Sequence, residues 1–175
     1  MGGDSPARRP VIGIVGWKDS GKTTLVVRLV EHFAAAGLRV STVKHAHHSV
    51  DPDQPGKDSW RHREAGAQEV LLATAARYAL FHELRGEPEP PLDELLARLA
   101  PADLVIVEGF KRFAHPKIEV HRAVRGTPLL AQKDPAIVAV ASDEPLPGLH
   151  VPVLGLDDIA GIAALIRRRL ELGPA

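Results

Sequence analysis

The sequence predicts a three-layer α/β domain with a mostly parallel sheet. Residues 11–15 form a short, apolar, β-branched run, which indicates a buried strand. A glycine-containing turn follows, then helical spacing over 24–36, then an alternating segment over 38–43 that indicates a second strand. Strand, glycine turn, helix and strand in this order make a βαβ unit, from which a parallel sheet is built.

Beyond residue 43 the chain begins with a long polar loop over 44–57 and then alternates between helical and strand-like segments. The expected helices are at 59–65, 92–99 and 157–170. The expected strands are at 69–73, 78–81, 103–108, 118–120, 137–140 and 151–154. Because the strands at 69–73 and 78–81 lie outside the βαβ unit, we expect them to form a strand-rich insertion.

Composition excludes several classes of protein. The 22 basic and 22 acidic residues balance, so a general nucleic-acid binder, which usually has a basic surplus, is not expected. The absence of cysteine excludes disulfides, thiolate zinc sites and cysteine nucleophiles. No apolar run approaches the ~18 residues of a membrane span, and residues 1–10 lack the apolar run of a signal peptide. We therefore expect a cytoplasmic protein without a membrane partner.

Residues 16–23 (GWKDSGKT) match the pattern G-x-x-x-x-G-K-[ST], the Walker A motif or P-loop. In this loop, backbone N–H groups point inward at phosphate oxygens, which requires glycine's backbone freedom and the positive end of the next helix. Lys22 is predicted to neutralise the β- and γ-phosphates, and the Thr23 hydroxyl to bind Mg²⁺. The nucleotide-binding residues predicted here are Gly16, Asp19, Ser20, Gly21, Lys22, Thr23 and Thr24. The fold is thus predicted to be that of a P-loop NTPase, with a flexible lead at 1–9 and a single nucleotide-binding domain at 10–175.

Glu108 ends the apolar strand at 103–108 and precedes Gly109. In P-loop proteins an acidic residue at this position approaches the Mg²⁺ water shell or polarises the attacking water. The usual residue at this position is Asp. Because Glu is one methylene longer, either role is open to Glu108. The alternative interpretation is a solvated acid at the end of a strand. We predict that Glu108 and Lys22 are catalytic and that Glu108 and Thr23 form the metal site.

A histidine-rich loop follows the second strand. It carries Lys44, His45, His47, His48 and Asp51. Three histidines and an acid within eight residues suit Zn²⁺ or Ni²⁺. Contacts with nucleotide, substrate or magnesium, and a solvent-exposed loop without a ligand, are the alternative interpretations. We expect Lys44 and Asp51 to act near the phosphates.

Asp143 follows the apolar strand that begins at Ile137. Its carboxylate suits the two hydrogen-bond donors of guanine at N1 and N2, so Asp143 is the predicted base-reading residue. Capping of a turn is the equally weighted alternative.

Four segments together resemble the molybdopterin-guanine dinucleotide biosynthesis accessory protein B (MobB) family. They are GWKDSGKTT, VKHAHHSVDPDQPGKDSWRHREAGA, DLVIVEGFKR and IVAVASD, and the resemblance covers residues 10–170. It implies a homodimeric GTP-binding protein with weak, Mg²⁺-dependent GTPase activity. It also implies a role beside molybdopterin and the guanylyltransferase that joins GMP to it in making the bacterial molybdenum cofactor. The family's VEGFK segment falls on 107–111 and adds Lys111 to the candidate phosphate or substrate loop.

Other functions stay open at this point. A small P-loop kinase needs an arginine-bearing lid, for which the candidates are Arg61, Arg63, Arg122 and Arg125. A metallochaperone-type GTPase would use the histidine loop. A homodimer is also favoured by the strand pair within Glu69–Phe81, because exposed strand edges tend to be covered by a two-fold partner.

Overall fold

Two compact units make up the chain in the computed structural model, which describes residues 9–46 and 50–173. Unit 1 extends to His45 and resumes at Leu92, and unit 2 consists of Ala46–Pro91. Residues 1–8 of the predicted lead lie outside the described part. Arg9 donates hydrogen bonds to the carbonyl oxygens of Leu96 (2.6 Å) and Leu99 (2.8 Å), so the end of the predicted lead contacts the folded chain.

The sheet of unit 1 has six strands. They are β1 (Val11–Val15), β2 (Val40–Lys44), β5 (Leu104–Glu108), β6 (Lys117–His121), β7 (Ile137–Ser142) and β8 (Val153–Gly155). Their order is β2-β5-β1-β6-β7-β8, and every neighbouring pair is parallel. The predicted α/β fold with a mostly parallel sheet is confirmed. In a parallel sheet all carboxyl ends meet at one edge, where ligands of such folds bind.

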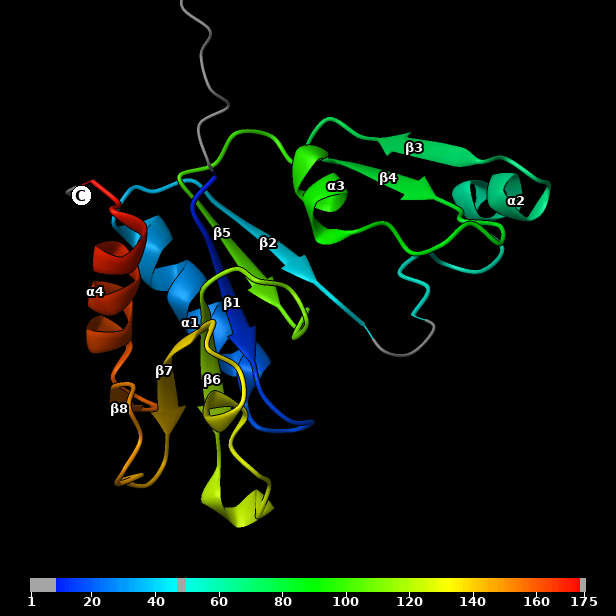
Figure 1. Cartoon of the computed structure of the whole chain (residues 1–175). Coiled ribbons are helices and arrows are strands. Elements are labelled where there is room, and N and C mark those ends of the chain that lie inside the picture. The colour runs from blue at the N-terminus through cyan, green and yellow to red at the C-terminus, as the bar shows by residue number, and fades with distance from the viewer. Residues whose placement is uncertain (1–8, 47–49, 174–175) are drawn as a thin grey trace, which may run out of the picture. The chain divides into compact units, whose positions relative to one another are not determined.

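Helices cover both faces of this sheet. They are α1 (Lys22–Ala35), α3 (Leu92–Ala97) and α4 (Ile159–Leu170). Successive strand residues point to opposite faces, so Leu104 and Ile106 join the core under α1 and α4, and Val105 and Val107 join the core under α3. Figure 1 shows α1 and α4 side by side on one face of the sheet. The result is the three-layer arrangement expected from the alternating sequence.

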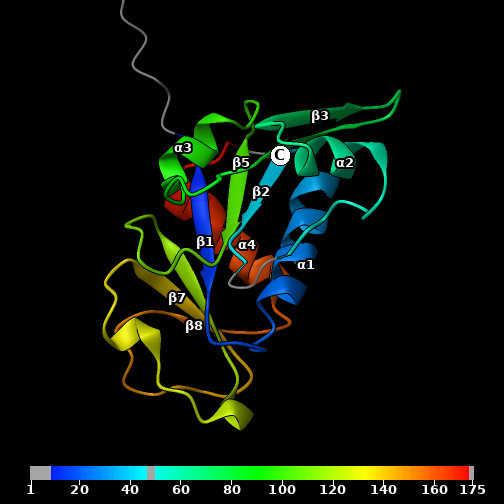
Figure 2. The ribbon, with the colours of Figure 1, turned by 90° about the vertical axis from the view of Figure 1, so that its right-hand side faces the viewer.

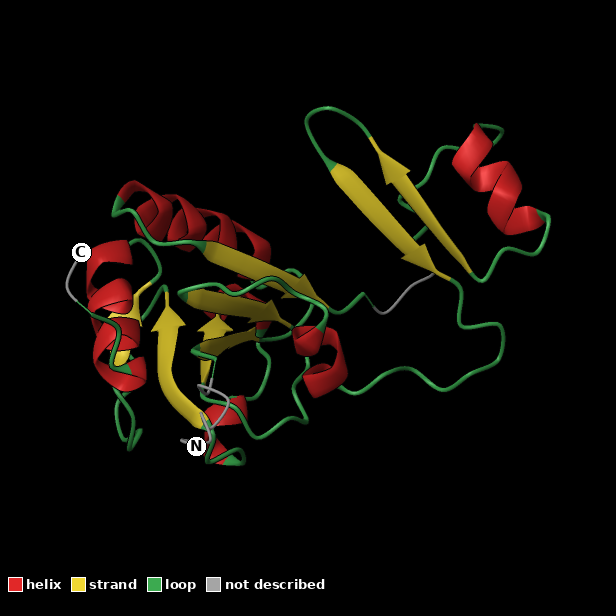
Figure 3. Cartoon of the chain, turned by 90° about the horizontal axis from the view of Figure 1, so that it is seen from above, coloured by secondary structure: helices red, strands yellow, loops and turns green. Residues whose placement is uncertain are grey.

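Unit 2 contains the predicted insertion. Its elements are α2 (Asp58–Glu64), β3 (Glu69–Ala73) and β4 (Tyr78–His82). The two strands pair antiparallel, and α2 lies beside β3 (Figure 3). The hairpin turn is held by Thr74, whose hydroxyl accepts hydrogen bonds from the N–H groups of Ala76 (3.3 Å) and Arg77 (3.1 Å).

Two short 3₁₀ helices after β6 were not expected from the sequence. They are η1 (Ala123–Arg125), which follows the carboxyl end of β6 (Figure 2), and η2 (Leu130–Gln132), which lies against β7. The fully buried Glu119 explains the position of η2, because its carboxylate accepts hydrogen bonds from the N–H groups of Leu130 (2.9 Å) and Ala131 (2.8 Å). No helix in residues 9–46 and 50–173 is long and apolar enough to cross a membrane.

Candidate nucleotide-binding site

The P-loop links the end of β1 to the start of α1. Gly16 has φ 152° and Gly21 has φ 99°, values that favour glycine. A Cβ on Gly16 would lie 2.5 Å from the Val120 carbonyl oxygen, so the loop packs tightly against β6. Gly21 is the N-cap of α1 and offers no side-chain oxygen, which leaves the first-turn N–H groups available to an anion.

Ser20 gives a second indication of a polar ligand in this loop. Its side chain is 2% exposed, and its Oγ has no hydrogen-bond partner among the described residues. A buried hydroxyl is normally paired, so an unpartnered one in a phosphate-binding turn fits a loop shaped for an oxygen-rich ligand.

Strand order brings three predicted site residues together. β5 lies between β2 and β1, and its last residue, Glu108, is in register with Lys44 on β2. The Thr23 hydroxyl, at the start of α1, donates to Glu108 Oε1 at 2.7 Å. Lys44 Nζ lies 3.5 Å from the same carboxylate oxygen and 3.4 Å from Thr23 Oγ1. Glu108 is 8% exposed, so it is not a solvated acid at a strand end.

The Thr23–Glu108 pair has the chemistry of a magnesium site. Mg²⁺ prefers hydroxyl, carboxylate and phosphate oxygens and keeps several waters. The two side chains already place a hydroxyl and a carboxylate oxygen within 2.7 Å of each other beside the P-loop. Thr23 and Glu108 therefore fit a Mg²⁺ ion that would bind together with a nucleoside triphosphate.

Lysines surround this pair. Lys22 Nζ donates to the Trp17 carbonyl oxygen at 2.7 Å. Burial lowers the pKa of Lys22, the charge of Lys111 lowers this pKa further, and Glu108 opposes the shift. Lys44 lies on the other side of Glu108. Asp19 is a second carboxylate near Lys22, so three cations face two carboxylates and the site keeps a positive surplus that suits a phosphate group.

Two arginines that follow β6, Arg122 and Arg125, contact residues of the P-loop. Arg122 Nε donates to the Ser20 carbonyl oxygen at 3.1 Å. Arg125 lies 3.3 Å from the carboxylate of Asp19, which has φ 58°. From the sequence, both arginines are candidates only for the lid of a kinase. In the structure they brace the backbone of the loop, and nothing in the sequence places the segment after β6 beside Asp19.

Asp143 lies at the carboxyl end of β7 and has two partners in unit 1. Its Oδ1 accepts a hydrogen bond from the Ala123 N–H at 2.9 Å, and its Oδ2 lies 3.8 Å from Arg122. The turn-capping contact is therefore present at the N-terminus of η1. Recognition of a guanine base by Asp143 stays a prediction.

Comparison with known proteins settles the family. The family model for molybdopterin guanine dinucleotide synthesis protein B, MobB, matches residues 11–143. This chain belongs to the MobB family.

Its relatives cover nearly the whole chain. It is 39% identical over 160 residues to the molybdopterin-guanine dinucleotide biosynthesis adapter protein of Escherichia coli, covering 90% of this chain and 91% of that one. It is 40% identical over 165 residues to the protein of that name from Haemophilus influenzae, with coverage of 93% and 90%. A crystal structure of molybdopterin-guanine biosynthesis protein B matches with a TM-score of 0.73 at 31% identity, covering 92% of this chain and 99% of that one.

The histidine-rich loop of this MobB-family chain is divided between the two units. In unit 1 the His45 N–H donates to the Glu108 carbonyl oxygen at 2.9 Å, and the His45 ring stacks on Phe110 at 4.7 Å between centroids. His47 and His48 lie outside the described residues. Among the residues that are described, no group of three His, Asp or Glu side chains is placed to hold a metal ion. The transition-metal hypothesis therefore has no support in the described part of the loop.

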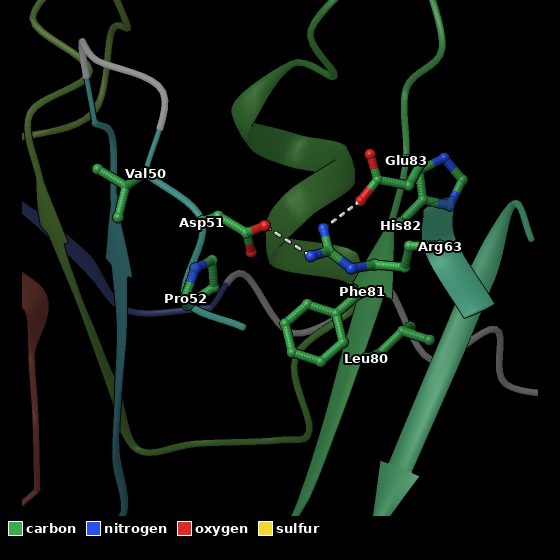
Figure 4. A pocket seen from close by; sticks show the side chains of 8 residues that line it. All are labelled: Val50, Asp51, Pro52, Arg63, Leu80, Phe81, His82 and Glu83. Atoms are coloured by element: carbon green, nitrogen blue, oxygen red, sulfur yellow. Dashed lines mark hydrogen bonds and ion pairs between the residues drawn. The ribbon is translucent and has the colours of Figure 1, made fainter. Parts of the chain in front are cut away.

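Asp51, predicted to act near the phosphates, is an ion-pair partner in unit 2. Its carboxylate lies 2.6 Å from Arg63, whose hydrogen bond holds the pKa of Asp51 below its ordinary value. Arg63 also contacts Asp53 (3.2 Å) and Glu83 (2.7 Å) and lies over the Phe81 ring. Figure 4 shows Arg63 in an open pocket of about 440 Å³ within unit 2. With three acids around one cation, this pocket lacks the positive surplus of the P-loop.

Proposed function

We propose that this MobB-family chain binds Mg²⁺–GTP at its P-loop and serves as an adapter in molybdopterin guanine dinucleotide synthesis. The observation that carries the proposal is the Thr23–Glu108 hydrogen bond of 2.7 Å next to Lys22, because it joins a metal-binding oxygen pair to a phosphate-binding loop. The adapter role follows from the names of the Escherichia coli and Haemophilus influenzae relatives. A GTP-dependent role is proposed to operate in the cytoplasm.

Hydrolysis is proposed to be slow. Glu108 is engaged by both Thr23 (2.7 Å) and Lys44 (3.5 Å), so its carboxylate is better placed to hold the magnesium shell than to take a proton from water. Lys22 is proposed to stabilise negative charge on the phosphates. A protein that binds the triphosphate tightly and turns it over slowly suits an adapter, whose output is an association.

The proposed partners are a second copy of the chain, molybdopterin and the guanylyltransferase that uses it. The hairpin of unit 2 supports the second copy. Leu71 pairs directly with Leu80, and Tyr78 lies two residues away on the same face. These side chains are 61%, 49% and 74% exposed, which is unusual for a contiguous apolar set. We propose that the same hairpin of a partner chain covers this face.

Titration calorimetry of the purified protein with GTP, GDP and ATP, each with and without Mg²⁺, tests the binding proposal. We expect GTP to bind most tightly and Mg²⁺ to strengthen it. Equal affinity for GTP and ATP would contradict guanine recognition, and no binding of either would contradict the nucleotide site.

Base recognition by Asp143 has its own test. Replacement of Asp143 by Asn exchanges an acceptor for a donor, so we expect weaker GTP binding and stronger binding of xanthosine triphosphate. Because Asp143 also accepts the Ala123 N–H, which the Asn carbonyl oxygen preserves, the turn should persist. Unchanged selectivity would move base recognition to other groups.

A further inference from the structure

Lys111 follows β5 and Gly109, and its ammonium group rests on an aromatic ring of the P-loop. Lys111 Nζ lies 4.7 Å from the centroid of the Trp17 ring. We propose that Lys111 is a second phosphate-binding lysine, held on Trp17, that turns to the terminal phosphate of a bound nucleoside triphosphate. This inference rests on the proposed GTP binding and assigns the recognition of the γ-phosphate.

The contact of Lys111 with Trp17 is weak enough to be exchanged for a contact with a phosphate. Trp17 is 36% exposed, and a cation over an exposed aromatic ring is held only loosely. A charge-assisted hydrogen bond to a phosphate oxygen is stronger. Moving the Lys111 ammonium group from the Trp17 ring to a bound triphosphate is therefore energetically favourable.

Trp17 contacts two of the three lysines of the site, Lys22 and Lys111. Its carbonyl oxygen accepts from Lys22 Nζ at 2.7 Å, and its ring carries Lys111. The indole itself is fixed, because Nε1 donates to the Pro128 carbonyl oxygen at 2.8 Å. One residue of the loop thus keeps two cations at the place where phosphates are expected.

The two ammonium groups repel each other across this residue. The charge of Lys111 is the largest contribution to the lowered pKa of Lys22 after burial. An anion placed between two like charges removes that repulsion, so the arrangement favours a highly charged ligand. The terminal phosphate distinguishes a triphosphate from a diphosphate. Of the two lysines outside the P-loop motif, Lys44 already pairs with Glu108, so Lys111 is the one available to respond to this phosphate.

The backbone of Lys111 is held in place, so only its side chain has to move. Lys117, which is 1% exposed, donates from Nζ to the carbonyl oxygens of Lys111 and Phe113, both at 2.8 Å. Asp134 lies 2.6 Å from the same ammonium group and balances its charge. Rotation of a four-carbon side chain from a fixed backbone is a small rearrangement.

The test uses Trp17 as the reporter. The chain has two tryptophans, so a Trp60→Phe background leaves Trp17 as the only indole. In this background we would titrate GDP and a non-hydrolysable GTP analogue with Mg²⁺, following indole emission and calorimetric affinity. Lys111→Gln is compared with Arg112→Gln, which removes the same charge from the neighbouring exposed residue of the same loop.

We expect Lys111→Gln to weaken the GTP analogue on the order of tenfold, while GDP affinity changes less than about twofold. The part of the emission change specific to the triphosphate should disappear with it. Lys111→Arg should restore most of the analogue's affinity, and Arg112→Gln should behave as the parent does.

Two results would overturn the inference while leaving the proposed function intact. One is unchanged affinity of Lys111→Gln for the analogue. The other is an equal loss for GDP and the analogue, which would make Lys111 a brace of the loop. If the Trp60→Phe parent binds neither nucleotide, the proposed GTP site and this inference both fail.

Discussion

The two units differ in how their strands are covered. In unit 1 all five residues of β5 are buried, because helices lie on both faces of the sheet. In unit 2 four of the five residues of β3 and the first three of β4 are exposed. When both faces of a strand are covered, the only side chains that it can present to a ligand are those at its ends. A hairpin with an exposed apolar face has an unfinished core and is suited to association.

The two units also differ in the charges that gather at their candidate sites. At the P-loop, Lys22, Lys44 and Lys111 outnumber the carboxylates of Asp19 and Glu108. In unit 2 the single cation of Arg63 is surrounded by the carboxylates of Asp51, Asp53 and Glu83. An anion is therefore attracted to unit 1. These differences support the proposal that unit 1 binds nucleotide and that unit 2 mediates self-association.

Lys22→Ala is expected to have the largest effect and to act on unit 1 alone. Loss of a charge-assisted contact to the phosphates is expected to cost about 2–4 kcal/mol, which corresponds to roughly 30- to 1000-fold weaker GTP binding. Calorimetry measures the affinity, and sedimentation velocity measures the oligomeric state. Loss of the dimer together with GTP binding would show that the two functions are not separate.

Leu80→Lys is expected to act on unit 2 alone. It places a charge on the apolar face formed with Leu71 and Tyr78, so we expect a dimeric parent and a monomeric variant at micromolar concentration. Ala75→Lys adds the same charge in the hairpin turn and serves as the control. A monomeric parent at high concentration, with or without GTP, would rule out the association.

Glu108→Gln is expected to have a smaller, selective effect. The amide keeps the shape and an oxygen that accepts from Thr23, and it removes the charge that attracts Mg²⁺ and Lys44. GTP binding should persist, while Mg²⁺-dependent turnover, measured as phosphate release, should fall. Identical turnover in parent and variant would leave Glu108 with a structural role only.

Most of the fold was predictable because the residue patterns of the individual strands and helices match the elements that the structure contains. Strand β1 is at the expected residues, and the βαβ unit around the P-loop is confirmed. The predicted insertion is also present, since two strand-like apolar stretches at 69–73 and 78–81 are joined by a turn and pair as a hairpin. The two 3₁₀ helices were missed because the buried Glu119 that holds η2 has no local signature in the sequence.

The candidate site was predictable only in part. The P-loop is predicted by its motif, and Glu108 is predicted by its place at the end of a strand. The two lie at the same edge of the sheet because the carboxyl ends of parallel strands meet there. The bracing of the loop by Arg122 depends on β6 lying next to β1, which is a property of strand order and cannot be read from spacing. The pairing of Asp51 with Arg63 similarly depends on how unit 2 folds.

The smallest expected effect concerns acid unfolding, because each unit has an Arg–Asp ion pair whose carboxylate is exposed. The Arg39 guanidinium hydrogen-bonds Asp103 in unit 1 and lowers the pKa of that carboxyl from 3.8 to about 2. In unit 2 the hydrogen bond from Arg63 lowers the pKa of Asp51. Since the folded pKa lies below the unfolded one, each pair stabilises its unit above the ordinary pKa and loses this contribution as the pH falls through the folded pKa.

Asp103→Asn and Asp51→Asn are therefore expected to lower the thermal midpoint of their own unit slightly at pH 7. The differences should shrink below about pH 4, and for Asp103 the difference should vanish below about pH 2. Because both carboxylates are exposed and screened by solvent, the effects should be small. Trp17 reports on unit 1 and Trp60 on unit 2, so single-tryptophan variants followed by fluorescence from pH 7 to 2 measure each unit separately. A difference that grows on acidification would contradict these ion pairs, and a variant that shifts both midpoints equally would show that the two units unfold as one.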